Sequence, residues 1–193
     1  MRRVAAFDFD GTLTTSDTLV PFLRAVVGNR DLALAAIVNA PRFALAVISD
    51  RSRDAAKAAL FRRVLAGRSA AAVRTLGERY ADSIVTHRLR SGMPERIEWH
   101  RDQGHEIVIV SASLTLYLDA VGRRLGLDAV IATELEVGPD GALTGEIVGA
   151  NVRRAEKVRR LEAWLGGDAE IWAYGDSTGD RELLERADHS MRI

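Results

Sequence analysis

The sequence contains no cysteine among its 193 residues. Disulfide bonds, thiolate nucleophiles and cysteine-ligated zinc are therefore excluded. The chain also carries no net charge, because 27 basic residues balance 27 acidic ones. Proteins that bind nucleic acids usually carry a basic patch, so this balance gives no support to a nucleic-acid partner.

Long hydrophobic runs are missing as well. The most apolar part of the chain, residues 31–48, is interrupted by Asn39, Pro41 and Arg42, whereas a membrane span needs about 20 apolar residues. We interpret this stretch as two short buried helices around a proline kink, and we expect no stable membrane span. The alternative is an apolar surface for a homodimer or for a lipid interface, because exposed apolar patches usually mark partner sites.

The N-terminal residues do not have the design of a signal peptide. Arg2 and Arg3 lead directly into the apolar residues of a short strand, so we expect a cytoplasmic protein. The hydrophobic content of 47% indicates a globular chain. This length is sufficient for one sizeable core and a small accessory unit.

Lysine is scarce, because arginine supplies almost every basic side chain. The only lysines are Lys57 and Lys157, which suggests that a lysine is kept for its compact point charge. We interpret Lys57 as a surface residue. Lys157 lies in a strong helical pattern over residues 151–165, and its alternative interpretation is a solvated helix face among several arginines.

The stretch that organises the chain is a short apolar run, Val4–Phe7, followed by Asp8, Asp10, Gly11 and Thr12. Alternate side chains of a strand point the same way, so the two carboxylates would crowd onto one face at a high cost in free energy. A divalent cation between them would remove that cost, and oxygen ligands suit Mg²⁺. The alternative is a strand end with polar caps before a turn.

Two further strands end in polar residues. Ile107–Val110 leads into Ser111, and Ile171–Tyr174 leads through Gly175 into Asp176 and Asp180. Ligands of an open parallel sheet gather beyond the carboxyl ends of its strands, so we expect these side chains to lie together. Taken singly, Ser111 could be an ordinary helix N-cap and Asp180 an acidic residue in a first helical turn.

The pattern of elements divides the chain in two. From residue 94 onward helices alternate with strands, including a hairpin around the turn at residues 138–141, which indicates a parallel sheet with helices on both faces. Residues 15–88 instead have helical patterns throughout, directly after the first strand. The predicted fold is therefore α/β, with a Rossmann-like sheet domain and an inserted helical unit.

In order, the chain offers the motif DxDGT, a serine, a lysine and the motif GDxxxD, at Asp8, Ser111, Lys157 and Asp176. This order resembles the haloacid dehalogenase (HAD) superfamily of phosphatases, from Arg3 to about residue 187. A helical cap after the first strand is typical of subfamily IB, the subgroup similar to phosphoserine phosphatase. The resemblance implies a core domain over residues 1–14 and 89–193 and an all-helical cap over residues 15–88.

The resemblance also implies a function, namely hydrolysis of a phosphomonoester on a small metabolite through an aspartyl-phosphate. Asp8 would attack phosphorus, and Asp10 would give a proton to the leaving alcohol and later take one from water. Mg²⁺ would be held by Asp8, the backbone carbonyl of Asp10, Asp176 and Asp180. The residues implied to bind the phosphate are Gly11, Ser111, Ala112 and Lys157.

The resemblance is incomplete where the substrate would be recognised. Phosphoserine phosphatases usually have a glutamate nine residues after the nucleophile, where this chain has Asp17. We expect Asp17 to face the leaving group and to favour a substrate with an amine; the alternative is that it caps the first helix of the insertion. L-phosphoserine specificity does not follow, and histidinol phosphate or another amino-alcohol phosphate is the alternative substrate.

Two other functional classes remain open. Receiver domains also combine a parallel sheet with a phosphorylated aspartate, Mg²⁺, a hydroxyl and a lysine, but they are binding switches and lack an inserted helical unit. Asp10 separates the two classes, because a group that promotes hydrolysis would defeat a lasting phosphoryl signal. A catalytically silent protein that binds a partner through the apolar helices is the third class.

The four histidines are expected at the surface or at helix ends.

Overall fold

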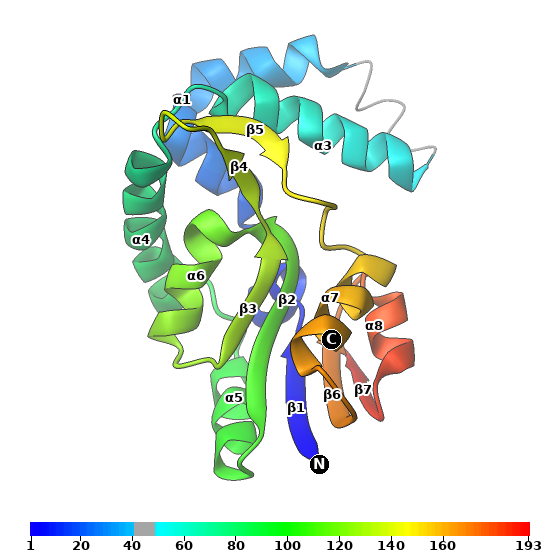
Figure 1. Ribbon diagram of the computed structural model, residues 1–193. Coiled ribbons are helices and arrows are strands. Elements are labelled where there is room, and N and C mark those ends of the chain that lie inside the picture. The colour runs from blue at the N-terminus through cyan, green and yellow to red at the C-terminus, as the bar shows by residue number, and fades with distance from the viewer. Residues whose placement is uncertain (41–48) are drawn as a thin grey trace.

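The computed structural model describes residues 1–40 and 49–193, so the predicted kink at Pro41 lies outside the described residues. A five-stranded sheet with the order β3-β2-β1-β6-β7 forms the centre of the fold (Figure 1). All four neighbouring pairs are parallel, which confirms the predicted α/β sheet. The strands are Arg2–Phe7 (β1), Glu106–Leu114 (β2), Ala129–Thr133 (β3), Ala169–Gly175 (β6) and His189–Arg192 (β7).

Helices cover both faces of this sheet. Ala5 and Phe7 of β1 belong to one apolar core and Val4 and Ala6 to another, because successive side chains of a strand point to opposite faces. A central strand buried on both sides therefore reads as a continuous apolar run. The flanking helices are Met93–Asp102 (α5), Thr115–Arg124 (α6), Ala155–Leu165 (α7) and Arg181–Arg186 (α8).

Between the first strand and α5 the chain forms a helical insertion, which we define as α1 (Leu19–Val38), α3 (Asp50–Leu65) and α4 (Ala70–His87). Figure 1 shows α1 and α3 beyond the carboxyl ends of the strands. A hairpin of β4 (Leu135–Val137) and β5 (Leu143–Ile147) lies against this insertion. The hairpin therefore packs two strands onto the insertion, which the sequence predicts as entirely helical.

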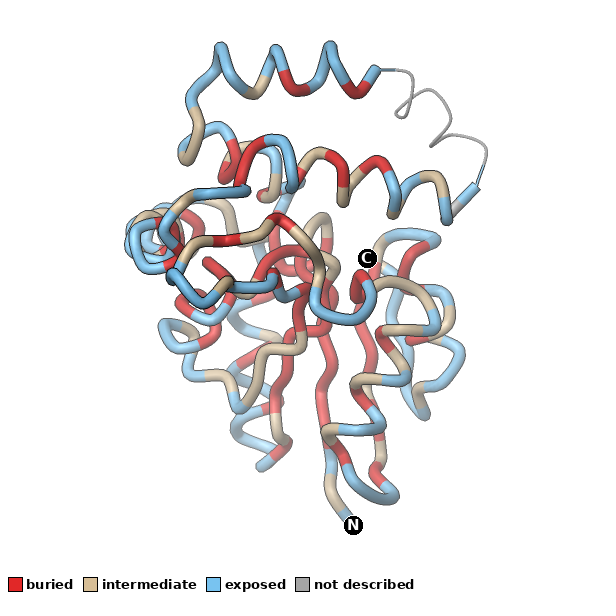
Figure 2. Tube along the Cα trace, turned by 45° about the horizontal axis from the view of Figure 1, so that its top comes forward, coloured by how far each residue is buried: buried red, intermediate tan, exposed pale blue. Residues whose placement is uncertain are grey.

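The apolar stretch of α1 is less buried than expected. The side chains of Leu34, Ile37 and Val38 are 46%, 69% and 58% exposed, so the prediction of a buried helix is wrong on this side. Figure 2 shows why, since α1 lies at the outer edge of the insertion. Gly28 interrupts α1 with a φ of 82°. No helix among residues 1–40 and 49–193 is long and apolar enough to cross a membrane.

Two histidines lie inside the fold. His100 is in the last turn of α5, as a helix-end role predicts, but it is fully buried. One of its ring nitrogens lies 2.8 Å from the Tyr174 hydroxyl and the other 2.8 Å from Nδ1 of His105. His105 is also buried, so a surface position is wrong for both residues. Burial and the neighbouring His105 lower the pKa of His100 to about 4.

This shift predicts a pH-dependent stability. Between pH of about 6.5 and 4 the unfolded chain binds a proton at His100 that the folded chain does not, so stability is lost as the pH falls through this range. We expect Tm to fall on acidification and the variant His100→Gln, which cannot titrate, to show a smaller fall. Parallel Tm profiles for the two proteins would contradict the prediction.

The contact between α4 and α6 predicts a second effect on stability. A Cβ at Gly77 of α4 would overlap the backbone carbonyl of Leu116 on α6. Gly77→Ala should therefore destabilise the protein by about 1–3 kcal/mol, as overpacking does, although alanine favours a helix by roughly 1 kcal/mol over glycine. The control is Gly167→Ala, which meets no neighbouring atom. Urea denaturation measures the free energy of unfolding of both variants. A value for Gly77→Ala equal to that for Gly167→Ala would contradict the close contact between α4 and α6.

Candidate active site

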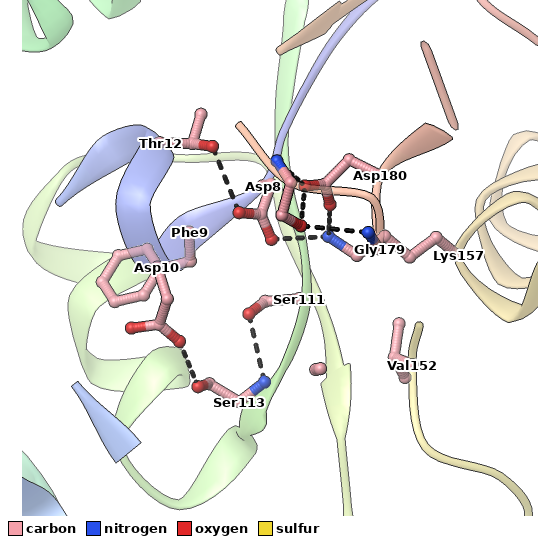
Figure 3. Close-up of polar contacts among 12 residues, drawn as sticks. Asp8, Phe9, Asp10, Thr12, Ser111, Ser113, Val152, Lys157, Gly179 and Asp180 are labelled. Atoms are coloured by element: carbon pink, nitrogen blue, oxygen red, sulfur yellow. Dashed lines mark hydrogen bonds and ion pairs between the residues drawn. The ribbon is translucent and has the colours of Figure 1, made fainter. Parts of the chain in front are cut away.

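The site begins where β1 ends. The backbone N–H of Asp8 still bonds to the Tyr174 carbonyl of β6 at 2.9 Å, so Asp8 stays in line with the sheet. The chain then leaves it through one wide turn, η1 (Phe9–Leu13), in which Gly11 has a φ of 84°. Because Asp10 lies in this turn, the two carboxylates have separate partners (Figure 3). The two carboxylates therefore do not project side by side from one strand as predicted, because β1 ends before Asp10, although both side chains line one cavity.

Asp8 lies in a buried ionic cluster with Lys157 and Asp180. The Lys157 ammonium donates to Oδ1 of Asp8 at 2.5 Å and to Oδ1 of Asp180 at 2.6 Å. Lys157 is only 2% exposed, so it does not lie on a solvated helix face. Two carboxylates and further hydrogen bonds are what a buried ammonium needs to offset its loss of hydration.

Burial and the attraction of Lys157 act in opposite directions in this cluster. Burial raises the pKa of Asp8 to about 6, although Lys157 opposes the shift. Burial disfavours the charge of Lys157, yet its pKa is raised because both carboxylates stabilise the ammonium. Burial would likewise raise the pKa of Asp180, but Lys157 and the hydrogen bonds from Ser177 outweigh it and lower that pKa. The cluster is therefore charged at neutral pH.

Among residues 1–40 and 49–193, one acidic group has the geometry of a metal site. Asp8, Asp176 and Asp180 each offer an oxygen, and these atoms lie within 4.8 Å of one another. Thr12 connects two of them, since its hydroxyl lies 3.1 Å from Asp8 and 3.4 Å from Asp176. Three carboxylates against the single ammonium of Lys157 leave an excess of negative charge, which fits a hard divalent cation such as Mg²⁺.

Gly11 stands in the turn for a second reason besides its φ. A Cβ there would overlap the carboxylate of Asp176. The glycine of the DxDGT motif therefore lets the turn approach Asp176, which brings the first and last predicted motifs together.

Asp10 has a different environment. Its Oδ1 accepts from the backbone N–H of Thr18 at 2.7 Å and from the Thr18 hydroxyl at 2.6 Å. Its Oδ2 accepts from the Ser113 hydroxyl (Figure 3). The Thr18 hydroxyl also lies 2.8 Å from that of Tyr117. Burial raises the pKa of Asp10, although these hydrogen bonds oppose the shift.

Ser111 lies within β2 and is buried. The N-cap position of α6 belongs to Leu114, so Ser111 is not an ordinary helix cap. Its hydroxyl accepts from the N–H of Ser113 at 3.1 Å. A cavity of about 140 Å³ brings together six of the predicted site residues, namely Asp8, Asp10, Ser111, Ala112, Lys157 and Asp180.

Asp17 does not line this cavity. Its side chain is exposed, and Oδ2 accepts from the backbone N–H of Val20 at 3.0 Å, in the first turn of α1. This hydrogen bond is the one expected for a helix-capping role. A direct role in recognising the substrate stays a prediction.

Two basic residues at the site were not predicted from the sequence. Arg153 lines the cavity, and Lys57 of α3 donates to the carbonyl of Ala112 at 2.6 Å. The interpretation of Lys57 as a surface residue is therefore wrong. The scarcity of lysine was the signal that could have identified it, but nothing local in the sequence connects α3 with β2.

Comparison with known proteins agrees with this geometry. The family model of haloacid dehalogenase-like hydrolases matches residues 5–185. The protein CicA of Caulobacter vibrioides is 36% identical over 186 residues, which cover 96% of this chain and 83% of CicA. Phosphoserine phosphatase SerB1 of Mycobacterium tuberculosis is 31% identical over 202 residues, covering 98% of this chain and 64% of SerB1.

A solved structure shares the whole fold. The crystal structure of a protein of unknown function from Bordetella pertussis superposes with a TM-score of 0.84 at 26% sequence identity, covering 100% of this chain and 90% of that one. The family model spans most of the chain and includes every residue of the ionic cluster and the cavity. The chain therefore belongs to the haloacid dehalogenase-like hydrolases.

Proposed function

We propose that this protein is a Mg²⁺-dependent phosphomonoester hydrolase that acts on a small phosphorylated metabolite in the cytoplasm through an aspartyl-phosphate at Asp8. The observation that carries the proposal is the division of labour between two carboxylates beside one cavity. Asp8 lies in the ionic cluster with Lys157, whereas Asp10 is held apart by Thr18 and Ser113. Two carboxylates in different environments can take different roles in one reaction.

Asp8 is the nucleophile in this proposal. Lys157 and Thr12 each bond to one of its oxygens, so the carboxylate is oriented and its charge is held close to the incoming phosphate. An Asp8 oxygen attacks phosphorus, the bond to the leaving alcohol breaks, and the phosphoryl group transfers to Asp8. Gly11, Ser111, Ala112 and Lys157 are the residues that we propose to bind the phosphate oxygens, because such transfers depend on positioning and charge neutralisation.

Asp10 is the general acid and base. Burial raises the pKa of its carboxyl, which makes the protonated form easier to reach when the leaving oxygen needs a proton. After transfer the resulting carboxylate takes a proton from the water that attacks the phosphoryl group. A receiver-like switch would be poorly served by such a residue, so its presence favours an enzyme.

The residues that would hold the metal are Asp8, Asp176 and Asp180, with the backbone carbonyl of Asp10. Bound Mg²⁺ would supply charge neutralisation for the phosphate oxygens. Lys157 has a related effect on the protein side, since its ammonium limits repulsion between Asp8 and Asp180.

The relatives indicate a general class of substrate and not one compound. SerB1 is named a phosphoserine phosphatase, and we propose a similar small phosphomonoester here, with histidinol phosphate or another amino-alcohol phosphate as the alternative. We further propose that residues 15–88 are a cap over a core formed by residues 1–14 and 89–193. The exposed side chains of Leu34, Ile37 and Val38 in this cap would suit a homodimer contact.

Replacement of each of the two carboxylates tests the role proposed for it. Asp8→Asn should reduce turnover of a generic aryl phosphate to background, because an amide is a poor nucleophile. Asp10→Asn should slow turnover by about 10²–10⁴-fold, the usual contribution of proton transfer. Steady-state assays with the exposed Asp168→Asn as control measure both effects. Turnover near the wild-type rate in Asp8→Asn would show that the nucleophile is another residue.

The proposed site also predicts that activity depends on a divalent cation. Removal of divalent cations with a chelator should abolish hydrolysis, and Mg²⁺ should restore it. Ca²⁺ should restore little activity, because it takes more ligands at longer distances and so would place Asp8 poorly for attack. Full activity in the chelator, or with Ca²⁺ alone, would contradict the proposed site.

A further inference from the structure

Lys57 extends from the helical insertion to the C-terminal end of β2. Its ammonium donates to the Ala112 carbonyl at 2.6 Å and to Oδ1 of Asn151 at 2.9 Å. Its Nζ lies 5.6 Å from the ring centre of Phe61, one turn further along α3. A single side chain of α3 therefore contacts two segments of the chain that belong to the sheet domain.

Asn151 contacts α3 at two residues, Lys57 and Asp54. Its Nδ2 donates to Asp54 at 2.7 Å, while its Oδ1 accepts from Lys57 and, at 3.0 Å, from Thr133. Asp54 and Lys57 are three residues apart and so lie on the same face of α3. The buried amide of Asn151 thus holds this face of α3 against the end of β3.

The Ala112–Ser113 peptide group continues the contact into the site. Its carbonyl accepts from Lys57, and its N–H donates to the Ser111 hydroxyl at 3.1 Å. Because a peptide group is planar, a bond that fixes the carbonyl also fixes the direction of the N–H. The Ser113 hydroxyl then donates to Asp10. One peptide group therefore connects Lys57 to Ser111 and to Asp10.

The charges around Lys57 keep this contact ionic at neutral pH. Burial lowers the pKa of Lys57 to about 8, while the carboxylates of Asp10, Asp54 and Asp17 oppose the shift and Arg153 adds to it. The side chain is therefore charged at pH 7. A charged donor makes a stronger hydrogen bond to a carbonyl than a neutral one.

We infer that Lys57 is a positioning residue, which holds the Ala112–Ser113 peptide and through it sets Ser111 and Asp10 for the reaction. This inference rests on the proposed function for the roles of those two residues. It follows that the site is complete only when α3 is docked on β2. The helical insertion then contributes to the rate and not only to the exclusion of water.

The test is Lys57→Met, with Arg63→Met as the matched control, since Arg63 is an exposed basic residue on the same helix. We expect kcat for an aryl phosphate to fall by about tenfold to 10²-fold in Lys57→Met, the scale of a small misplacement, with little change in KM. Lys57→Arg, which keeps a charged donor, should restore part of kcat. Arg63→Met should match the wild type.

Hydrogen exchange gives a second readout that does not depend on activity. In Lys57→Met the backbone amide of Ser113 should exchange faster than in the wild type, while Arg63→Met should leave it unchanged. If the wild type hydrolyses no phosphomonoester, the proposed function fails, but the exchange rates still test Lys57. Unchanged exchange at Ser113, or a kcat equal to that of Arg63→Met, would overturn the inference.

A second variant covers the case in which Lys57→Met does not fold. Asp54→Asn leaves Lys57 in place and removes the charge that holds Asn151. Ser113 should again exchange faster, and kcat should fall severalfold without a matching change in KM. Wild-type values for both would overturn the inference.

Discussion

The fold brings one ammonium and two carboxylates together where water is almost excluded. Asp8, Lys157 and Asp180 come from the end of β1, the first turn of α7 and the loop after β6, and all three are buried. Removing Lys157 would leave two buried carboxylates without their counter-charge, and such a loss typically costs about 3–5 kcal/mol. The positions of three elements at the carboxyl edge of the sheet therefore depend on one ionic cluster.

The same cluster explains why the second carboxylate must be kept apart. If Asp10 shared the surroundings of Asp8, both carboxylates would bond to Lys157 in the same environment, and they could not take different roles in one reaction. The turn at η1 prevents this by directing Asp10 toward Thr18 and Ser113. Thr18 is the N-cap of α1, at the start of the helical insertion, and Ser113 lies near the end of β2, so the state of Asp10 depends on both parts of the chain. Lys57 of α3 contacts the same end of β2, at the Ala112 carbonyl.

Much of this arrangement is encoded locally and could be predicted from the sequence. Apolar runs in the sequence indicate buried parallel strands, and polar residues at the carboxyl ends of such strands must meet at one edge of the sheet. That argument places Asp8, Ser111 and Asp176 without knowledge of the structure. Lys157 was placed at the site by the resemblance to the family, and the helical pattern around it and the rarity of lysine in this chain agreed with that placement.

What could not be predicted depends on contacts between distant segments. The direction of Asp10 is set by the backbone of a turn, and period-two reasoning fails as soon as the strand has ended. Lys57 contacts a carbonyl 55 residues away, and no periodicity on α3 distinguishes it from a surface residue. The burial of His100 likewise depends on Tyr174, 74 residues further along the chain.

The central claim is that Asp8 becomes phosphorylated during turnover, and trapping that intermediate tests it most directly. The enzyme is mixed with substrate and Mg²⁺, quenched in acid and reduced with borohydride, which converts an aspartyl-phosphate to homoserine. We predict that peptide mass spectrometry finds homoserine at position 8 only when substrate is present, with Asp10 unmodified. Turnover without modification of Asp8, or modification of a different carboxylate, would contradict the account.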